Sequence, residues 1–355
     1  MEISLKTPLR IEVPENAFAG DVPLVAVFRG QYVGCLHRGS VAAVDAAGRT
    51  HVSIGDAAQH VFLRSAAKPF QAMPAVLSGG LERFGISNAE LAVLCASHSG
   101  EPRHTDAVLS VLEKIGLDES RLRCGVHPPI NEATARQRWK SGVDPSPACN
   151  NCSGAHAGML LACRANGWPI EHYGSPDHPL QRATREILGA FASLSTGAVQ
   201  IAVDNCAVPT FRLPLNHAAQ SFARLASGDG LPQQLSEAAG RVVQAMTRHP
   251  EMVGGEERFD SDLMRLATGA VVAKGGAEGF QALGIIPQQL GVAIKITDGN
   301  PRAIPPVSLR VLEHFRALDP PQLQRLAEYG EPKIVNLQNE PVGRITAVFD
   351  FGGRA

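Results

Sequence analysis

A serine and a lysine three residues apart, Ser65 and Lys68, are the first residues of the chain that could carry covalent chemistry. They open a segment with helical periodicity, in which side chains three residues apart lie on one face. A serine becomes a nucleophile when a neighbouring base takes its proton, and a lysine with a lowered pKa can be that base. The alternative interpretation is structural, with Ser65 capping the helix and Lys68 exposed to solvent.

Two later segments carry groups that could complete such a site. Residues 95–101 (CASHSGE) include Ser97 and follow a helical segment that begins with the capping-box pattern Ser-x-x-Glu at residues 87–90. Lys274 ends an apolar run and precedes two glycines, which let a backbone approach a ligand closely. Taken singly, each segment also has an ordinary explanation, as a polar helix end or as a hairpin turn with a surface lysine.

The order of the three motifs is similar to that of class A β-lactamases and penicillin-binding proteins. Those proteins carry Ser-x-x-Lys, then a serine motif, then Lys-x-Gly on a strand. The combination favours acyl transfer through a serine. We therefore expect Ser65, Lys68, Ser97 and Lys274 to share one active site.

A cysteine-rich segment suggests a metal or a pair of buried thiols. Residues 149–158 (CNNCSGAHAG) contain Cys149 and Cys152, and Cys206 lies in a second polar segment. Structural zinc sites use four ligands, so a further group such as His156 would have to contribute. The alternative is that these cysteines are free thiols in the core, where unpaired cysteine is common.

Apolar periodicity places strands at both ends of the chain and helices between them. Strand patterns cover residues 24–29, 32–45, 51–54, 270–274, 278–285, 291–297, 333–337 and 342–350, and helical patterns include 154–166, 235–247, 302–317 and 322–329. We therefore predict an α+β fold in which residues 22–62 and 268–355 form an antiparallel sheet with flanking helices. Residues 63–267 are predicted to form a mainly helical lobe with most of the motifs, and residues 1–21 an N-terminal arm.

Composition excludes several classes of partner. Lys and Arg total 33 against 34 Asp and Glu, and the net charge of −1 argues against nucleic acid as the main partner. No apolar run approaches the ~18–20 residues that span a membrane, so we expect no membrane partner. The first residues lack a secretory pattern, and seven dispersed cysteines suit a reducing compartment. We therefore predict a cytoplasmic protein.

Taken together, the motifs resemble those of the bacterial type II asparaginase family of the rhizobial thermolabile type, also called class 3. The resemblance runs over roughly residues 22–350. The matching segments are 64–69 (RSAAKP), 97–101 (SHSGE), 152–158 (CSGAHAG), 204–209 (DNCAVP), 253–255 (VGG), 258–260 (RFD), 274–279 (KGGAEG) and 295–299 (KITDG).

The resemblance implies hydrolysis of L-asparagine to L-aspartate and ammonia by a homodimer with a serine-β-lactamase-like or penicillin-binding-protein-like fold. It also implies two Ser–Lys tandems, Ser65 with Lys68 and Ser97 with Lys274. Finally, it implies that Arg64, His156 and Asp204 contact the substrate.

The resemblance further implies a zinc site that uses Cys152, Cys206 and a lysine. The lysine position is Ala155 in this chain, and an alanine methyl group cannot coordinate metal. We therefore expect weak zinc binding or none. No organic cofactor is expected.

Two other functions remain open at this point. One is a different serine amidohydrolase on the same scaffold, such as a glutaminase or a β-lactam hydrolase. The other is a non-catalytic zinc-thiolate or regulatory protein, although such a protein has no need of two Ser–Lys pairs. Ammonia release from asparagine would discriminate between these functions.

Overall fold

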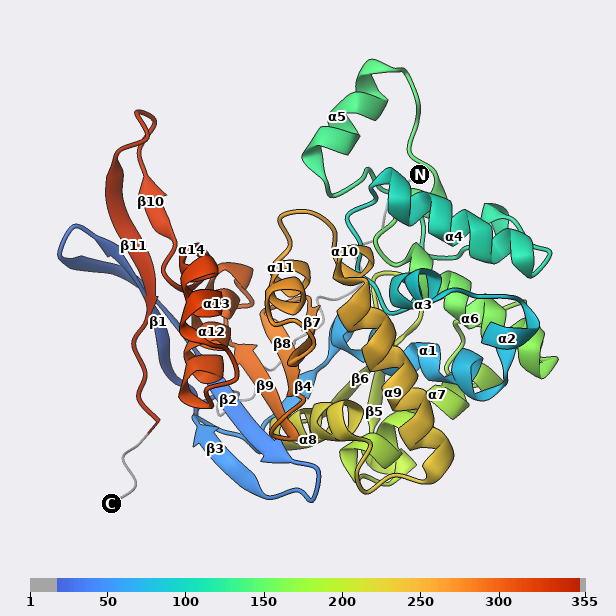
Figure 1. Cartoon of the computed structure of the whole chain (residues 1–355), viewed down its shortest axis with the longest axis horizontal. Helices are drawn as coiled ribbons and strands as arrows, with labels where there is room; N and C mark the ends of the chain where they lie inside the picture. The colour runs from blue at the N-terminus through green and yellow to red at the C-terminus, as the bar shows by residue number, and fades with distance from the viewer. Residues whose placement is uncertain (1–17, 352–355) are drawn as a thin grey trace, which may run out of the picture.

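Strands from both ends of the chain form one antiparallel sheet. The computed structural model describes residues 18–351, so residues 1–17 of the predicted N-terminal arm and residues 352–355 lie outside the described part. Within that part, the eight-stranded sheet has the order β10-β11-β1-β2-β9-β8-β7, with β3 paired to β2 (Figure 1). Its strands are β1 (Val22–Arg29), β2 (Tyr32–Asp45), β3 (Thr50–Ile54), β7 (Val271–Gly276), β8 (Phe280–Ile285), β9 (Leu290–Ile296), β10 (Lys333–Val335) and β11 (Pro341–Ala347).

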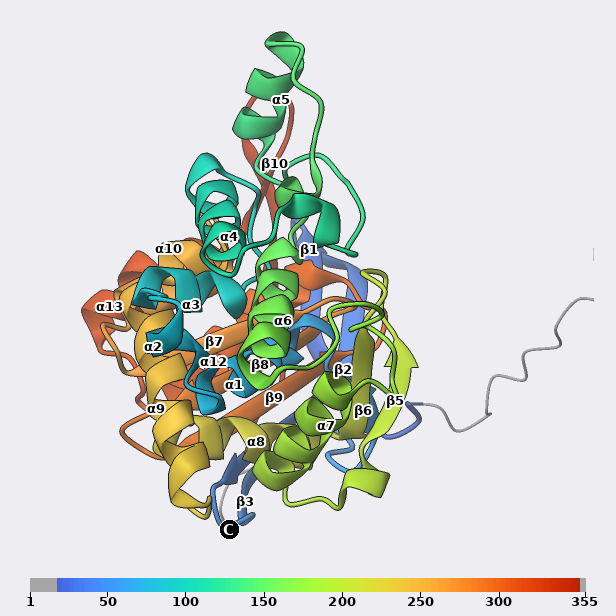
Figure 2. The same ribbon diagram turned by 90° about the vertical axis from the view of Figure 1, so that its right-hand side faces the viewer.

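The long strand β2 joins the two ends of the chain. It pairs with β1 and β3 from the first part of the sequence and with β9 from the last part. Strands β8 and β9 are buried along nearly their whole length, and both helix α8 (Leu215–Ser227) and helix α12 (Ile304–His314) pack against them. The sheet is therefore an internal layer with helices packed on it, as Figures 1 and 2 show.

The central part of the chain is mostly helical. Its helices are α1 (Lys68–Leu77), α2 (Gly80–Arg83), α3 (Asn88–Leu94), α4 (Pro102–Lys114), α5 (Glu132–Lys140), α6 (Ser153–Asn166), α7 (Pro179–Ala192), α8, α9 (Gln233–Arg248), α10 (Pro250–Val253) and α11 (Phe259–Leu266). This part also contains a three-stranded sheet, β4-β6-β5 (His60–Phe62, Pro209–Pro214 and Gln200–Val203), which the sequence analysis missed. Strands β4 and β5 have only three and four residues, which is too few for a clear period-two pattern. Strand β6 begins and ends with a proline, a residue that argues against a strand.

The predicted α+β architecture is confirmed, with local differences at element ends. Strand β2 has the predicted bounds, and the capping box of Ser87 and Glu90 begins α3 as expected. The single helix predicted over residues 322–329 is wrong. The chain forms α13 (Pro320–Arg325) and α14 (Ala327–Gly330) instead, because a capping box at Asp319 starts the helix earlier and the backbone leaves helical geometry at Leu326.

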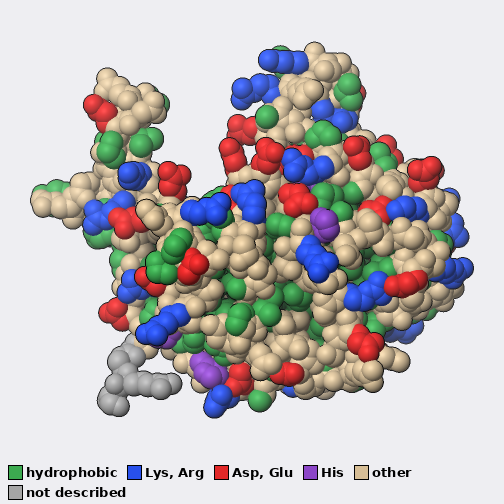
Figure 3. All heavy atoms as spheres, in the orientation of Figure 1, with side chains coloured by type: hydrophobic (Ala, Val, Ile, Leu, Met, Phe, Trp, Pro, Cys, Tyr) green, Lys and Arg blue, Asp and Glu red, His purple; other side chains and the backbone are tan. Residues whose placement is uncertain are grey.

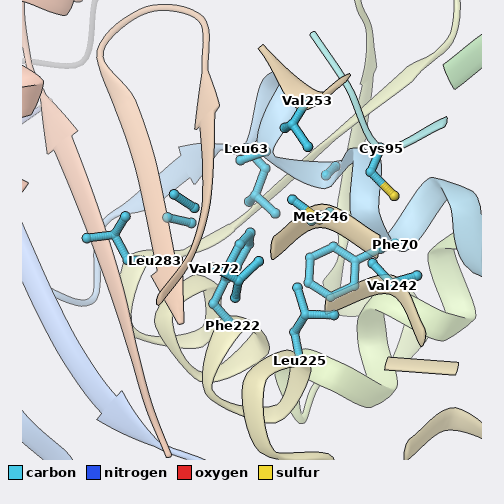
Figure 4. Close-up of a cluster of buried hydrophobic side chains, with 14 of the residues drawn as sticks. Leu63, Phe70, Cys95, Phe222, Leu225, Val242, Met246, Val253, Val272 and Leu283 are labelled. Carbon is cyan, nitrogen blue, oxygen red and sulfur yellow. The ribbon is translucent and has the colours of Figure 1, made fainter. Parts of the chain in front are cut away.

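A continuous core of buried side chains connects the sheet to the helices (Figure 4). Leu63, Cys95 and Val272 belong to it, and each is fully buried. Each also lies two residues before a predicted catalytic residue. The core therefore fixes the three segments that carry the predicted chemistry.

Helix α8 lies unusually close to the sheet because two glycines face it. Gly284 of β8 and Gly291 of β9 are cross-strand partners. A Cβ atom at Gly291 would lie 1.8 Å from the carbonyl oxygen of Ala219 and 2.4 Å from the amide nitrogen of Ala223, both in the helix backbone. Only glycine permits this contact, since backbone atoms cannot move aside as a flexible side chain can.

The surface carries charges of both signs. Figure 3 shows acidic and basic side chains interspersed over one face, with no large area of a single sign. The hairpin of β10 and β11 and the segment around α5 project from the body (Figures 1 and 3). Among residues 18–351, no helix is both long enough and apolar enough to cross a membrane.

We predict that Gly291→Ala lowers the free energy of unfolding by about 3 kcal/mol, because the added methyl group overlaps the backbone of α8. Gly240→Ala in α9 is the matched control, since a Cβ placed there has no described atom within 4 Å apart from its chain neighbours and the nearby backbone of its own helix. It should raise the free energy of unfolding by roughly 0.5–1 kcal/mol, the helix-propensity difference between alanine and glycine. Urea unfolding measures both changes, and equal effects of the two substitutions would contradict the close contact.

Candidate active site

The three predicted catalytic motifs meet at one cavity between the sheet and the helices. Ser65 lies in a 3-10 turn (Arg64–Ala67) after β4, Ser97 follows α3, and Lys274 is on β7. Ser65 and Ser97 both line a cavity of about 360 Å³. The structure thus brings together residues that the sequence separates widely.

The hydroxyl of Ser97 joins the two lysines. Its Oγ lies 3.0 Å from the Nζ of Lys68 and 3.0 Å from the Nζ of Lys274. Lys274 also donates to the carbonyl of Gly275 at 2.8 Å. Both lysines are buried, with 3% and 2% of their surface exposed, so water does little to screen their charges from each other.

The surroundings of Lys274 bring its pKa close to neutrality. Burial has the largest effect, and together with the positive charges of Lys68 and Arg258, and against the opposing effect of Asp260, it lowers the pKa of Lys274 to about 7. A neutral amine has a lone pair. Ser97 can therefore donate its hydroxyl hydrogen to Lys274 while it accepts a hydrogen bond from Lys68.

Ser65 is the partly exposed hydroxyl of the cavity. No hydrogen bond to its Oγ is formed within residues 18–351, and the Nζ of Lys68 contacts Ser97 instead. The preceding residue, Arg64, has a φ of 50°, a left-handed conformation that costs a side-chain-bearing residue free energy. Such a turn is held in place by its surroundings, and here it presents Ser65 at the cavity wall.

Arg64 and Asp204, both predicted to contact the substrate, are paired with each other. The Nε and Nη2 atoms of Arg64 donate to the Asp204 carboxylate at 3.0 and 2.8 Å. The Nη1 atom lies 2.5 Å from Glu278. The hydrogen bond to Asp204 is the largest effect that raises the pKa of Arg64. Their contact with substrate stays a prediction.

His156, the third predicted substrate contact, is fully buried. Its Nδ1 lies 2.7 Å from the hydroxyl of Tyr173, and its Nε2 has no hydrogen-bond partner among the described residues. Burial lowers the pKa of His156 to about 3, so the ring is neutral at physiological pH. Its contact with substrate also stays a prediction.

Cys152 and Cys206 are neighbours beside Lys68. The hydrogen bond between the two thiols and the charge of Lys68 lower the pKa of Cys152, whereas the same pairing raises the pKa of Cys206. The Nζ of Lys68 lies 3.2 Å from the Sγ of Cys152. Cys152 is therefore the thiol of this pair that ionises first, with Lys68 as its counterion.

The donors around these thiols do not fit the implied zinc site. Ala155 is buried and offers only a methyl group in place of the family's lysine. Within residues 18–351, no group of three or more His, Cys, Asp and Glu side chains could hold a metal ion. Two thiols fall short of the three or four protein ligands that zinc sites use.

Sequence reasoning assigned no role to three residues that line the cavity, namely Asn151, Arg258 and Asp260. The carbonyl of Asn151 accepts a hydrogen bond from Lys68 at 3.4 Å. Arg258 and Asp260 appear in the sequence analysis only within the segment 258–260 (RFD), which matches the family. Two charged residues that closely follow the glycines at 254–255 were the signal that could have identified them as candidate site residues.

Several solved structures are distantly similar to this chain. A structure of Mglu in its native form is 18% identical over 81% of this chain and 67% of that chain, with a TM-score of 0.45. A β-lactamase from Mycobacterium bovis is 14% identical over 78% and 94% of the two chains, with a TM-score of 0.42. A Bacillus glutaminase is 15% identical over 79% and 91%, with a TM-score of 0.36. Likenesses this distant carry no argument about activity.

Similarity at the level of the family is far more extensive. No curated protein matches the chain. The model of the L-asparaginase II family, in contrast, matches residues 25–347, which include every catalytic residue predicted above. This chain belongs to the L-asparaginase II family.

Proposed function

We propose that this amidohydrolase cleaves the side-chain amide of L-asparagine to give L-aspartate and ammonia, with Ser65 as the nucleophile. The observation that carries the proposal is the hydrogen-bonded chain Lys68–Ser97–Lys274 beside Ser65 in one cavity. Amide hydrolysis needs a nucleophile, a base and a proton for the leaving ammonia. This group of residues can supply all three.

In the proposed acylation step, Ser65 attacks the amide carbon while its proton moves to Ser97. Ser97 passes its own hydroxyl hydrogen to the neutral amine of Lys274, whose pKa of about 7 suits a base at neutral pH. Lys68 donates to Ser97 throughout and keeps the hydroxyl oriented. Backbone N–H groups at the start of the turn that holds Ser65 are the proposed donors to the developing oxyanion.

In the second half of the reaction the proton returns. The ammonium of Lys274 gives it back through Ser97 to the departing nitrogen, and ammonia leaves with an ester remaining on Ser65. Water then attacks the ester, with Lys274 again accepting a proton through Ser97. Lys274 returns that proton through Ser97 to the departing oxygen of Ser65, and L-aspartate is released. Each cycle consumes one water and restores the starting protonation of both lysines.

Ammonia release from L-asparagine by the purified protein tests the proposed function directly. L-Glutamine and a β-lactam, assayed at the same concentrations, test the two alternative serine hydrolases. The absence of turnover of all three compounds would contradict the proposal. The rhizobial-type subclass, the homodimer and the cytoplasmic location stay predictions.

Substitution of Ser65 by alanine should lower turnover of L-asparagine by roughly a thousandfold or more, because the reaction loses its nucleophile. Ser78→Ala, at the C-cap of the helix that follows, is the matched control and should keep full activity. Its hydroxyl only donates to the carbonyl of Ala75 in the last turn of that helix. Near-normal turnover of Ser65→Ala with an inactive Ser97→Ala variant would instead make Ser97 the nucleophile.

The pH profile should report Lys274. Since only the neutral amine can accept a proton, kcat/KM should fall as the pH drops below about 7, and by about tenfold per pH unit well below it. Lys274→Arg should be inactive across the whole range, since a guanidinium stays charged. Lys333→Met, in the exposed strand β10, should keep the wild-type profile. A flat profile between about pH 5 and about pH 9 would exclude Lys274 as the base.

Zinc content should be low. With only two thiols and the methyl group of Ala155 in place, we expect well under one zinc per chain in the purified protein, measured by mass spectrometry of the metal. A zinc chelator should leave turnover of L-asparagine unchanged. One tightly held zinc per chain, with loss of activity on its removal, would show that another group has replaced the missing lysine.

A further inference from the structure

Two charged side chains in the cavity have no part in the proposed proton transfers. Arg258 and Asp260 line the cavity together with both serines, and neither has an ion-pair partner among residues 18–351. Charged groups are rarely left without a counterion in a pocket unless a ligand supplies one. The two residues are therefore candidates for binding a substrate that carries both charges.

Arg258 has donors to spare. Its one side-chain hydrogen bond runs from Nη1 to the hydroxyl of Ser99, at 3.2 Å. A guanidinium has five N–H donors arranged in a fork that matches a carboxylate. The remaining donors of Arg258, which is half-buried, can take a carboxylate in the cavity without breaking an existing ion pair.

Arg64, the cation that the resemblance assigns to the substrate, is differently placed. Asp204 already binds it at two points, and Glu278 occupies a third. A substrate carboxylate at Arg64 would have to displace the largely buried Asp204 and leave that carboxylate without its partner, which is costly. Binding of a carboxylate to Arg258 displaces no ion-pair partner among the described residues and therefore has no such cost.

Asp260 is held in position but still able to accept more donors. One carboxylate oxygen accepts the backbone N–H of Gly275 at 2.6 Å, and the other accepts the side-chain amide of Gln281 at 2.9 Å. A carboxylate has about four acceptor positions, so an ammonium group can still bind. Asp260 and Arg258 both belong to the start of helix α11, which keeps their spacing fixed.

We propose that Arg258 binds the α-carboxylate of the substrate and Asp260 binds its α-ammonium group. This inference rests on the proposed function and specifies its substrate class as free α-amino acids with a side-chain amide. An asparagine inside a peptide has neither group and would be excluded. The start of α11 thus acts as the specificity element, while the serines and lysines perform the chemistry.

Three amides distinguish the proposed contact of Arg258 from that of Asp260. L-Asparagine has both groups, succinamate lacks the ammonium group, and 3-aminopropanamide lacks the α-carboxylate. Arg258→Met should lower kcat/KM about tenfold to a hundredfold for the first two, the size expected for a charged hydrogen bond, and mainly through KM. For 3-aminopropanamide it should lower kcat/KM only by the smaller amount that follows from its effect on the pKa of Lys274, an amount common to all three amides. Arg265→Met, at the exposed end of the same helix, is the matched control and should affect none of the three.

The test of Asp260 compares the ratio of kcat/KM for two substrates instead of a single rate, because the charge of Asp260 also raises the pKa of Lys274. Asp260→Asn should lower kcat/KM for L-asparagine about tenfold more than for succinamate. The change that the substitution makes to the base of the free enzyme is common to both substrates and cancels in that ratio.

The contrary outcomes are distinct. An equal loss for all three amides in Arg258→Met, with an unchanged circular dichroism spectrum, would overturn the carboxylate contact. A selective loss in Arg64→Met instead of Arg258→Met would assign that contact to Arg64.

If the wild-type protein hydrolyses none of the amides, the proposed function fails. Calorimetric measurement of L-aspartate binding then tests the inference by itself. Arg258→Met should then bind L-aspartate at least tenfold more weakly, and equal or undetectable binding by wild type and variant would overturn it.

Discussion

Two buried lysines share the single hydroxyl of Ser97, and the rest of the site follows from that contact. Two ammonium groups this close, in surroundings that exclude water, repel each other strongly. The repulsion is relieved when one lysine gives up its proton. Burial is the largest effect that lowers the pKa of Lys274, which is about 7, so Lys274 can give up its proton near neutral pH. The Nζ of Lys68 instead has the Sγ of Cys152 as a further neighbour, at 3.2 Å. Two residues of one chemical type therefore have different surroundings in one site.

This arrangement requires the helices and the sheet to be held rigidly together. Lys68 opens helix α1, while Lys274 lies on strand β7, and a shift of about an ångström between them would break one of the contacts to Ser97. The packing provides that rigidity. Helix α8 lies against the sheet at backbone distance over Gly291, and the core side chains beside each catalytic segment are fully buried. The close packing of the fold therefore maintains the distances on which the chemistry of the site depends.

The sequence predicted the features that depend on local pattern. Strand β2 and helix α3 were predictable because their apolar spacing and capping residues lie within a few positions of one another. The four residues proposed to be catalytic were predictable as a group that meets in space because each lies in a short motif. Their partners were not: Lys68 was expected to contact Ser65, three positions away, but its Nζ lies on Ser97. That choice depends on how α1 packs against the segment after α3, which no local pattern contains. The pairing of Arg64 with Asp204 was hidden for the same reason.

The two residues proposed to bind the substrate also act on the base. Arg258 lowers the pKa of Lys274, and Asp260 raises it. A zwitterion that pairs with both would weaken both influences together, so the two changes oppose each other and the base stays poised near neutrality. A ligand that carries only the carboxylate would offset Arg258 alone and shift Lys274 toward its protonated form, in which it cannot accept a proton. Binding of a complete α-amino acid would therefore preserve the catalytic protonation state, and the charge balance of the pocket would add selectivity at the chemical step to selectivity at binding.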